Sequence, residues 1–168
     1  NQRPDGAIYL GQGNDQDYIR EVQGKKGKRP AFGLLDPRNT SATEYAAVAA
    51  QTGRLLRPFD KAKADKLIAS AKAAYAWAKA NPDQGTTPDE EMRAGVKLLQ
   101  AYAAAELFNA TGDAAYNQDF ISLYKEGALK AHLSFAWLPG LVRWAYVNSK
   151  QPGVDEAIRS EMIASIKE

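Results

Sequence analysis

The segment Tyr102–Tyr116, YAAAELFNATGDAAY, decides the fold expected for this chain. Its alanine, leucine and phenylalanine residues recur at the three- and four-residue spacing of a buried helix. Gly112 is a typical C-terminal helix cap, and Asp113 is a typical N-terminal cap for a second helix. A connection this short predicts an antiparallel helix hairpin.

Alanine-rich helices are predicted on both sides of this segment. Thr40 or Ser41 can cap the first helix, Pro58 ends it, and Asp60 caps the second. Six helices joined by mostly short links predict three antiparallel hairpins. Alanine allows helices to approach closely, as a two-layer ring requires, although helix propensity alone would also explain its abundance. The six predicted ranges are 42–57, 61–81, 92–112, 114–128, 141–150 and 154–167.

The helical period also predicts which faces of the first two helices are buried. In the first helix the predicted buried stripe comprises Tyr45, Val48, Ala49, Thr52, Leu55 and Leu56. In the second helix the predicted buried face comprises Leu67, Ala71, Ala74, Tyr75 and Ala78, with lysines on the opposite side.

Residues 1–39 form an irregular region rich in glycine and proline. Ala7–Leu10 could form a short strand, and the rest is typical of a long loop. Long loops in compact domains are usually functional or packed on a larger body. The basic run Lys25–Arg29 is interpreted as a solvated loop rather than as a site for a polyanion.

Composition excludes several classes of protein. The 168 residues suffice for one compact domain, and 22 basic against 20 acidic residues give no strong field for nucleic acid. The absence of cysteine excludes a disulfide framework and thiolate metal sites. No apolar run approaches the roughly 20 residues of a membrane span, and no sequence motif predicts a cofactor.

A chain that starts at Asn1, without Met, is expected to be a processed or excised piece of a longer protein.

Four segments in order resemble the family 9 glycoside hydrolases, a cellulase family built on an (α/α)6 barrel. Tyr102–Tyr116 is similar to the family pattern W-A-A-A-E-L-x-x-A-T-G-D-x-x-Y, with Tyr102 in place of Trp. The other three segments are RPDGAIYLGQGN at 3–14, RPAFGLLDPRNTSATEYAAVAAQTGRLLRPFD at 29–60 and ADKLIASAKAAYAWAKANP at 64–82.

The resemblance implies one partial all-α domain over residues 1–168: an irregular loop region at 1–39, then antiparallel hairpins of the barrel at 40–168. It also implies a parent enzyme, secreted or periplasmic, that hydrolyses β-1,4-glucan or related oligosaccharides with inversion. Inversion uses two carboxyl groups about 6.5–9.5 Å apart. In the family one belongs to a D-A-G-D motif and the other is a glutamate near the end of a much longer domain. This sequence contains neither D-A-G-D nor the family's H-H-R substrate motif, so the chain is expected to be inactive alone.

Local carboxylates are poor substitutes for that pair. Asp15 and Asp17 lie at alternate positions of a loop, and the acidic run 89–91 is typical of a helix N-terminus, where it favours the helix dipole. Glu44 and Glu106 are expected to be buried and hydrogen-bonded to nearby backbone.

Sugar binding depends on exposed aromatic faces. Trp137 aligns with a family tryptophan that resembles a sugar platform, although core packing explains it equally well. Tyr18 lies in the loop where the family often has His and Trp in its cleft wall, and it is the second candidate for substrate binding. Trp77 and Trp144 are expected to pack in the core, and the lone His132 is expected to be structural or exposed.

Two other classes of function stay open. The chain could be a non-catalytic helical interaction or carbohydrate-binding module derived from the barrel, or a piece of another α/α toroid such as a different polysaccharide hydrolase or a lyase. In each case a half-barrel would expose helix faces that need a partner. The expected partners are the missing remainder of the barrel or a second copy of the chain, besides the β-glucan oligosaccharide of the parent enzyme.

Overall fold

A computed structural model describes residues 2–9, 12–13, 33–34, 37–82, 90–130 and 138–166. Its regular secondary structure is mainly helical, as predicted. The exceptions are isolated β-bridges and one antiparallel pair of two-residue strands, β1 (Gln12–Gly13) and β2 (Gly33–Leu34). None of its helices is long and apolar enough to cross a membrane. The helical elements are α2 (Asn39–Leu56), α3 (Lys61–Ala80), α4 (Glu90–Thr111), α5 (Ala114–Lys125), η1 (Ala128–Lys130), α6 (Leu138–Val147) and α7 (Glu156–Ile166).

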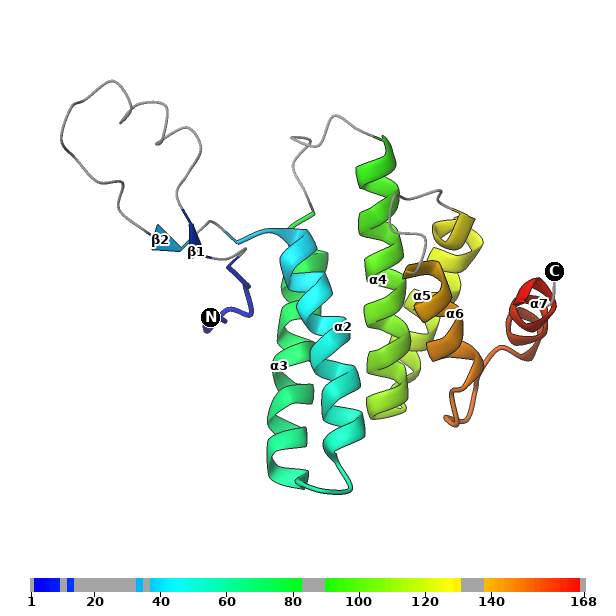
Figure 1. The fold of residues 1–168 in the computed structure, drawn as a ribbon, viewed down its shortest axis with the longest axis horizontal. Coiled ribbons are helices and arrows are strands. Elements are labelled where there is room, and N and C mark those ends of the chain that lie inside the picture. Colours follow the sequence, from blue (N-terminus) through cyan, green and yellow to red (C-terminus); the bar gives the residue numbers. More distant parts are fainter. Residues whose placement is uncertain are drawn as a thin grey trace.

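Helices α2, α4 and α6 form one layer, with α4 in the middle (Figure 1). Late residues of α4 contact late residues of both neighbours. Glu106 accepts a hydrogen bond from Arg54 of α2, and the Asn109 side chain donates one to the carbonyl of Ala145 in α6 at 2.9 Å. The three helices of this layer therefore run in the same direction.

Helices α3 and α5 form a second layer against the first. The rings of Tyr75 in α3 and Tyr116 in α5 meet edge to face, with centroids 5.7 Å apart. Lys79 and Asp119 join the same two helices at 2.7 Å. Chain order thus alternates between an inner and an outer layer, which is the arrangement expected for part of an (α/α)6 barrel. We call this arrangement of α2 to α7 the half ring.

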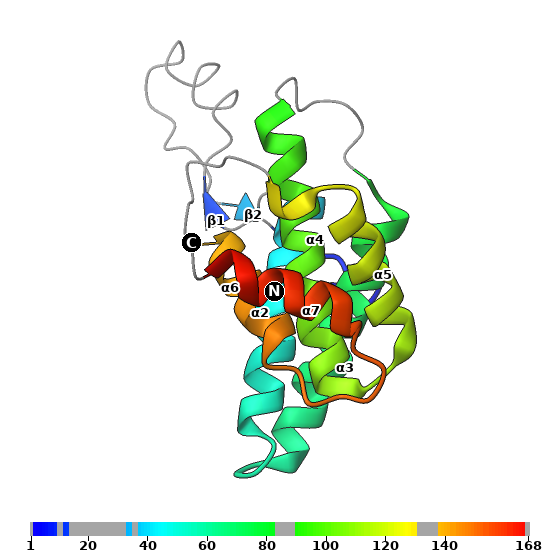
Figure 2. The same cartoon turned by 90° about the vertical axis from the view of Figure 1, so that its right-hand side faces the viewer.

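Helix α7 departs from the predicted third antiparallel hairpin. It lies across the other helices instead of alongside α6, as the two perpendicular views show (Figures 1 and 2). Tyr146 of α6 fixes this junction: its ring stacks on Phe120 with centroids 4.0 Å apart, and its hydroxyl accepts from the backbone NH of Asp155 at 3.0 Å. Ile158 and Met162 then bury one side of α7 in the core.

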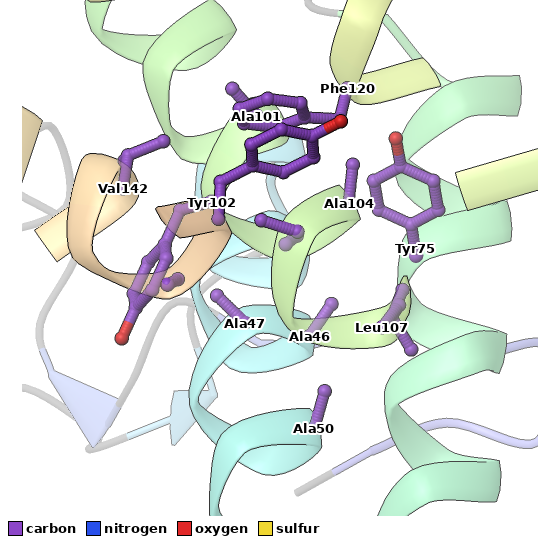
Figure 3. Close-up of a cluster of buried hydrophobic side chains, with 14 of the residues drawn as sticks. Ala46, Ala47, Ala50, Tyr75, Ala101, Tyr102, Ala104, Leu107, Phe120 and Val142 are labelled. Carbon is purple, nitrogen blue, oxygen red and sulfur yellow. The ribbon is translucent and has the colours of Figure 1, made fainter. Parts of the chain in front are cut away.

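Small residues let α2 approach both of its neighbours closely. Its alanines gather against α4 (Figure 3). A Cβ on Gly53 would meet Ile68 Cγ1 at 2.7 Å and the Ala64 carbonyl oxygen at 3.0 Å, so α2 and α3 nearly touch there. The fully or almost fully buried alanines of α2 are Ala42, Ala46, Ala47, Ala49 and Ala50.

The predicted buried stripe of the first helix is therefore wrong at three of its six positions, whereas Ala49 is buried and Tyr45 and Leu56 are half-buried. Val48 and Leu55 are 50% and 56% exposed, and Thr52 is exposed as well. These larger side chains lie on the edge of α2 that faces away from α3 and α4, because close packing selects the alanine face instead. The predicted buried face of the second helix is confirmed at Ala71, Ala74, Tyr75 and Ala78, whereas Leu67 is only half-buried.

Helix boundaries follow the predicted caps closely. Asp60 accepts a hydrogen bond from the Lys63 NH at 2.9 Å, Asp113 accepts one from the Ala115 NH at 3.0 Å, and Gly112 adopts a positive φ of 72°. The start of α2 is the exception. Its N-cap is Arg38, which makes no side-chain capping bond, so the helix begins before Thr40 and Ser41.

The N-terminal segment 2–9 is anchored to α3. Gln2 donates a hydrogen bond to the Ser70 carbonyl at 2.9 Å, and Gly6 lies so close to α3 that a Cβ would be 2.4 Å from the Ala73 carbonyl oxygen. The strand predicted at 7–10 is reduced to isolated bridges at Ile8 and Tyr9. Part of the loop region is thus packed on the helical body, as its length suggested.

Replacing Gly6 by alanine should release this segment. The substitution adds a clash with backbone and forces an L-residue to a φ of 97°. We expect the free energy of unfolding to fall by about 1–3 kcal/mol, measured by urea denaturation, together with faster amide exchange of residues 2–9.

Gly153→Ala is the matched control. Gly153 has a similar φ of 89° but open space around the added Cβ, so it should show only the backbone penalty of about 1 kcal/mol. An equal effect of both variants would contradict the close packing of Gly6 on α3.

Candidate functional site

The two ends of the half ring differ in their connections. At the C-terminal ends of the inner helices two links are short, 57–60 after α2 and 112–113 after α4, whereas 148–155 after α6 is longer. At their N-terminal ends lie the region before α2 and the connections 81–89 and 131–137. Because binding residues concentrate on loops held by a rigid scaffold, the N-terminal ends of α2, α4 and α6 are the candidate site. We call them the loop-bearing end (Figure 1).

The predicted substrate-binding residues belong to these connections. Trp137 immediately precedes Leu138, the buried first residue of α6. Trp137 and Tyr18 themselves lie outside the described residues, so the structure places neither. The same holds for Asp15, Asp17, Asp89, His132 and the basic run 25–29.

Asn39 connects two helices at the loop-bearing end. Its buried side-chain amide donates to the carbonyls of Ala78 at 2.5 Å and Asn81 at 3.1 Å, which joins the start of α2 to the end of α3. Thr43 donates back to the Asn39 carbonyl at 2.8 Å. Sequence reasoning missed Asn39 because its partners lie about 40 positions away, and a polar residue at a helix start signals only a cap.

Glu106 is the most deeply buried charged side chain of the described residues. Arg54 of α2 donates to Glu106 Oε2 through Nη2 at 2.9 Å and through Nε at 3.2 Å, and the Gln51 amide donates to Oε1 at 3.2 Å. The expected burial is confirmed, but the expected backbone partners are wrong: side chains of a neighbouring helix satisfy this carboxylate. The same expectation is wrong for Glu44, which is exposed.

Burial raises the pKa of Glu106, and the Arg54 guanidinium opposes that rise. The pKa of the Tyr102 hydroxyl is also raised, first by burial and then by the neighbouring Glu106. Both Glu106 oxygens are bonded to α2 and shielded from solvent, so they cannot reach a glycosidic bond. The group acts as a clamp between two inner helices.

Several other described carboxylates form helix caps or ion pairs. Asp65 bonds Arg57 at 3.1 Å, and Glu126 bonds Lys97 at 2.9 Å. Hydrogen bonds from Lys61 and then from Arg57 lower the pKa of the Asp65 carboxyl group, and the hydrogen bond from Lys97 lowers that of Glu126. In the part of the chain that the structure describes, no cluster of three or more His, Asp or Glu side chains could hold a metal ion.

The described tryptophans behave differently from each other. Trp77 is half-buried, whereas Trp144 is 55% exposed, so the expected core packing is wrong for Trp144. The reason is its position on α6, the last inner helix described: Leu138, Val142 and Tyr146 face the core, and Trp144 lies on the open side. Leu141 is exposed on the same side.

Replacing Arg54 by methionine should expose how much Glu106 depends on its partner. An unpaired buried carboxylate is strongly destabilising; since the Arg54 side chain is 28% exposed, we expect a loss of about 2–3 kcal/mol at pH 7. The raised pKa of Glu106 sets the sign of the pH dependence. Stability linked to this group is present below its unfolded-state pKa and is lost as pH rises through the folded-state value. The penalty measured by urea denaturation should therefore shrink at acidic pH and in the Arg54→Met, Glu106→Gln double variant.

Lys61→Met is the matched control, because it removes one cation from an exposed pair with Asp65. Such pairs contribute about 0–1 kcal/mol. If Arg54→Met cost no more than Lys61→Met at pH 7, the clamp would not be electrostatic.

Comparison with known proteins matches this architecture to one family. The family model described as glycosyl hydrolase family 9 matches residues 2–158. Endoglucanase D of Acetivibrio thermocellus is 29% identical over 141 residues, which cover 79% of this chain and 22% of that protein.

Solved structures give the same result. The crystal structure of the family 9 endoglucanase J30 superposes with a TM-score of 0.72 at 25% identity, covering 99% of this chain and 32% of that one. A metagenome-derived family 9 endoglucanase gives a TM-score of 0.72 at 26% identity, covering 99% of this chain and 31% of that one. The chain thus spans about a third of these structures and about a fifth of the curated relative. The protein belongs to glycosyl hydrolase family 9.

Proposed function

We propose that this chain is the half ring of a β-1,4-glucan hydrolase, supplying part of the cleft wall but not the two catalytic carboxylates. The family match over residues 2–158 carries this proposal, and endoglucanase is the activity named for the relatives. The asymmetric connections add support, because the loop-bearing end is where a substrate would meet variable segments. Trp137, one residue before α6, is the proposed sugar platform at that end, and Tyr18 is the second proposed contact.

Catalysis is assigned to residues outside this sequence. The proposed reaction needs an acid that protonates the leaving oxygen and a base that activates water. The buried and the helix-capping carboxylates support neither role: Glu106 is held by Arg54, and Asp60 and Asp113 cap helices. This chain would therefore contribute binding and shape to the parent enzyme.

Cellohexaose offered to the purified chain should bind weakly and stay uncleaved. We expect no reducing ends above buffer, and a Kd on the order of millimolar followed by tryptophan indole signals in NMR. Trp137→Ala should raise that Kd about fivefold, since an aromatic stacking contact contributes about 1 kcal/mol.

Phe59→Ala is the control for that experiment. Phe59 is an aromatic residue that is 86% exposed in the turn after α2, at the opposite end of the half ring. Hydrolysis by the pure chain would contradict the assignment of catalysis to other segments. Equal effects of the two variants would contradict the platform.

A second candidate function, a non-catalytic helical interaction module, is supported by the open edges of the half ring. Val48 and Leu55 on α2 and Trp144 on α6 leave apolar surface exposed where a ring would continue. We propose that further hairpins cover these edges in the parent protein and that a second copy covers them when the chain is alone.

Sedimentation velocity should detect this association. We expect concentration-dependent dimers of the purified chain, and a shift to monomer in Leu55→Lys because a charge cannot be buried there without a partner. Ala62→Lys, an equally drastic change at an exposed position of α3, should leave the dimer intact. A monomer at all concentrations would contradict self-association and leave the glucan-binding proposal unaffected.

A further inference from the structure

A pocket of about 290 Å³ lies where α5, η1, α6 and α7 meet. Its wall combines residues of the outer helix α5 and the crossing helix α7 with one residue of α6. Its described lining residues lie in helices and in η1, not in the connections proposed as the cleft. The lining residues are Tyr124, Lys125, Leu129, Arg143, Glu161 and Ser165.

The lining offers donors and acceptors side by side. Arg143 and Lys125 donate hydrogen bonds, Glu161 accepts them, and the Ser165 hydroxyl does both. Leu129 and the Tyr124 ring add apolar surface. Hydroxyl-rich ligands need this mixture, because each hydroxyl donates and accepts while the ring carbons contact an apolar face.

Charge distribution argues against a simple anion. Glu161 offsets one of the two cations, and the pocket borders the last residues of α5 and α7, whose C-terminal carbonyls carry partial negative charge. Lys125 and Arg143 in turn disfavour a cation. A neutral polyol fits this balance better than either ion.

The aromatic wall is held in place. Tyr124 stacks on Phe120 with centroids 6.4 Å apart and an interplanar angle of 21°, and Phe120 stacks on the buried Tyr146. Burial and a hydrogen bond to the Glu161 carboxylate raise the pKa of the Tyr124 hydroxyl to about 12. The phenol therefore stays protonated at neutral pH and can donate a hydrogen bond. A preformed site of this kind loses little conformational entropy on binding.

We propose that this pocket is a second carbohydrate-binding site, one that takes one or two sugar rings of a neutral glucan on the outer side of the half ring. Its volume lies just below the about 300–1,000 Å³ typical of ligand pockets, which suits a short chain end rather than a long polymer. The choice of glucan rests on the proposed function; the choice of a neutral polyol rests on the pocket alone.

Titration of the ¹⁵N-labelled chain with cellobiose tests the proposal. We expect saturable shifts of the amides of Tyr124, Arg143 and Glu161, with a Kd on the order of millimolar. Arg143→Ala should weaken this binding at least about tenfold by removing the strongest donor. Lys125→Ala changes an exposed residue that should not disturb folding, and it should weaken binding severalfold. Circular dichroism and the Tm confirm that each variant is folded.

Two controls separate this site from the cleft. Lys66→Ala removes an exposed lysine from α3, and Trp137→Ala removes the proposed platform; neither should change the shifts at the pocket. Shifts that respond to Trp137→Ala but not to Arg143→Ala would overturn the second site and leave the proposed function standing. Pocket shifts without any response of the Trp137 indole would support the second site and contradict the sugar platform proposed at Trp137.

Competing ligands test whether the pocket prefers a neutral sugar to an anion. Citrate and inorganic phosphate should produce no saturable pocket shifts at concentrations where cellobiose does. Tighter binding of either anion, or no pocket shift up to about 50 mM cellobiose, well above a millimolar Kd, would overturn the proposal.

Discussion

Close approach of α2 to α4 is the constraint on which the rest of the half ring depends. Alanine makes it possible: the side chains of Ala101, Ala103, Ala104 and Ala105 are fully buried on α4, and they face several helices at once because α4 has neighbours on all sides. Alanine loses no side-chain entropy on burial, but it also contributes little apolar area per residue. The interface therefore gains specificity from polar contacts, above all the ion pair between the Glu106 carboxylate and Arg54. The separation between the helices decides whether that ion pair can form.

Because the inner helices are parallel, their C-terminal ends lie together at one end of the half ring, where caps stabilise the helices. Their N-terminal ends lie together at the other end, where the connections can vary. Short links such as Gly112–Asp113 leave no room for insertions, and their caps satisfy the helix termini. At the opposite end the Asn39 side chain donates to two backbone carbonyls and so connects α2 to α3. The packing of these two helices therefore does not depend on the long connections.

Local signals in the sequence predicted the helices well and their partners less well. Asp60, Gly112 and Asp113 act within a few residues of themselves, so the helix boundaries they predict are accurate. In α2, alanine and larger apolar residues recur at the same helical period, and only the neighbouring helices determine that Ala46 and Ala50 are buried while Val48 and Leu55 are exposed. Asn39 and Arg54 have partners 39 or more positions away, and no local pattern reports them. Trp137 and Tyr18 rested on family resemblance, which reports ancestry rather than geometry.

The outer pocket shows why such sites escape sequence reasoning altogether. Its residues come from three helices and a 3-10 turn, and no local pattern connects them. Lys125 is an exposed charge at the end of α5, and Glu161 is an exposed charge in the middle of α7. They converge because α7 crosses the half ring instead of running along α6, and that crossing is set by Tyr146, which stacks on Phe120 and accepts from the NH of Asp155. The same aromatic stack continues to Tyr124 in the pocket wall. A packing contact inside the core thus determines the position of the Tyr124 ring that a sugar would contact at the surface. A change in the Phe120–Tyr146 contact should therefore alter the geometry of the pocket more than that of the loop-bearing end.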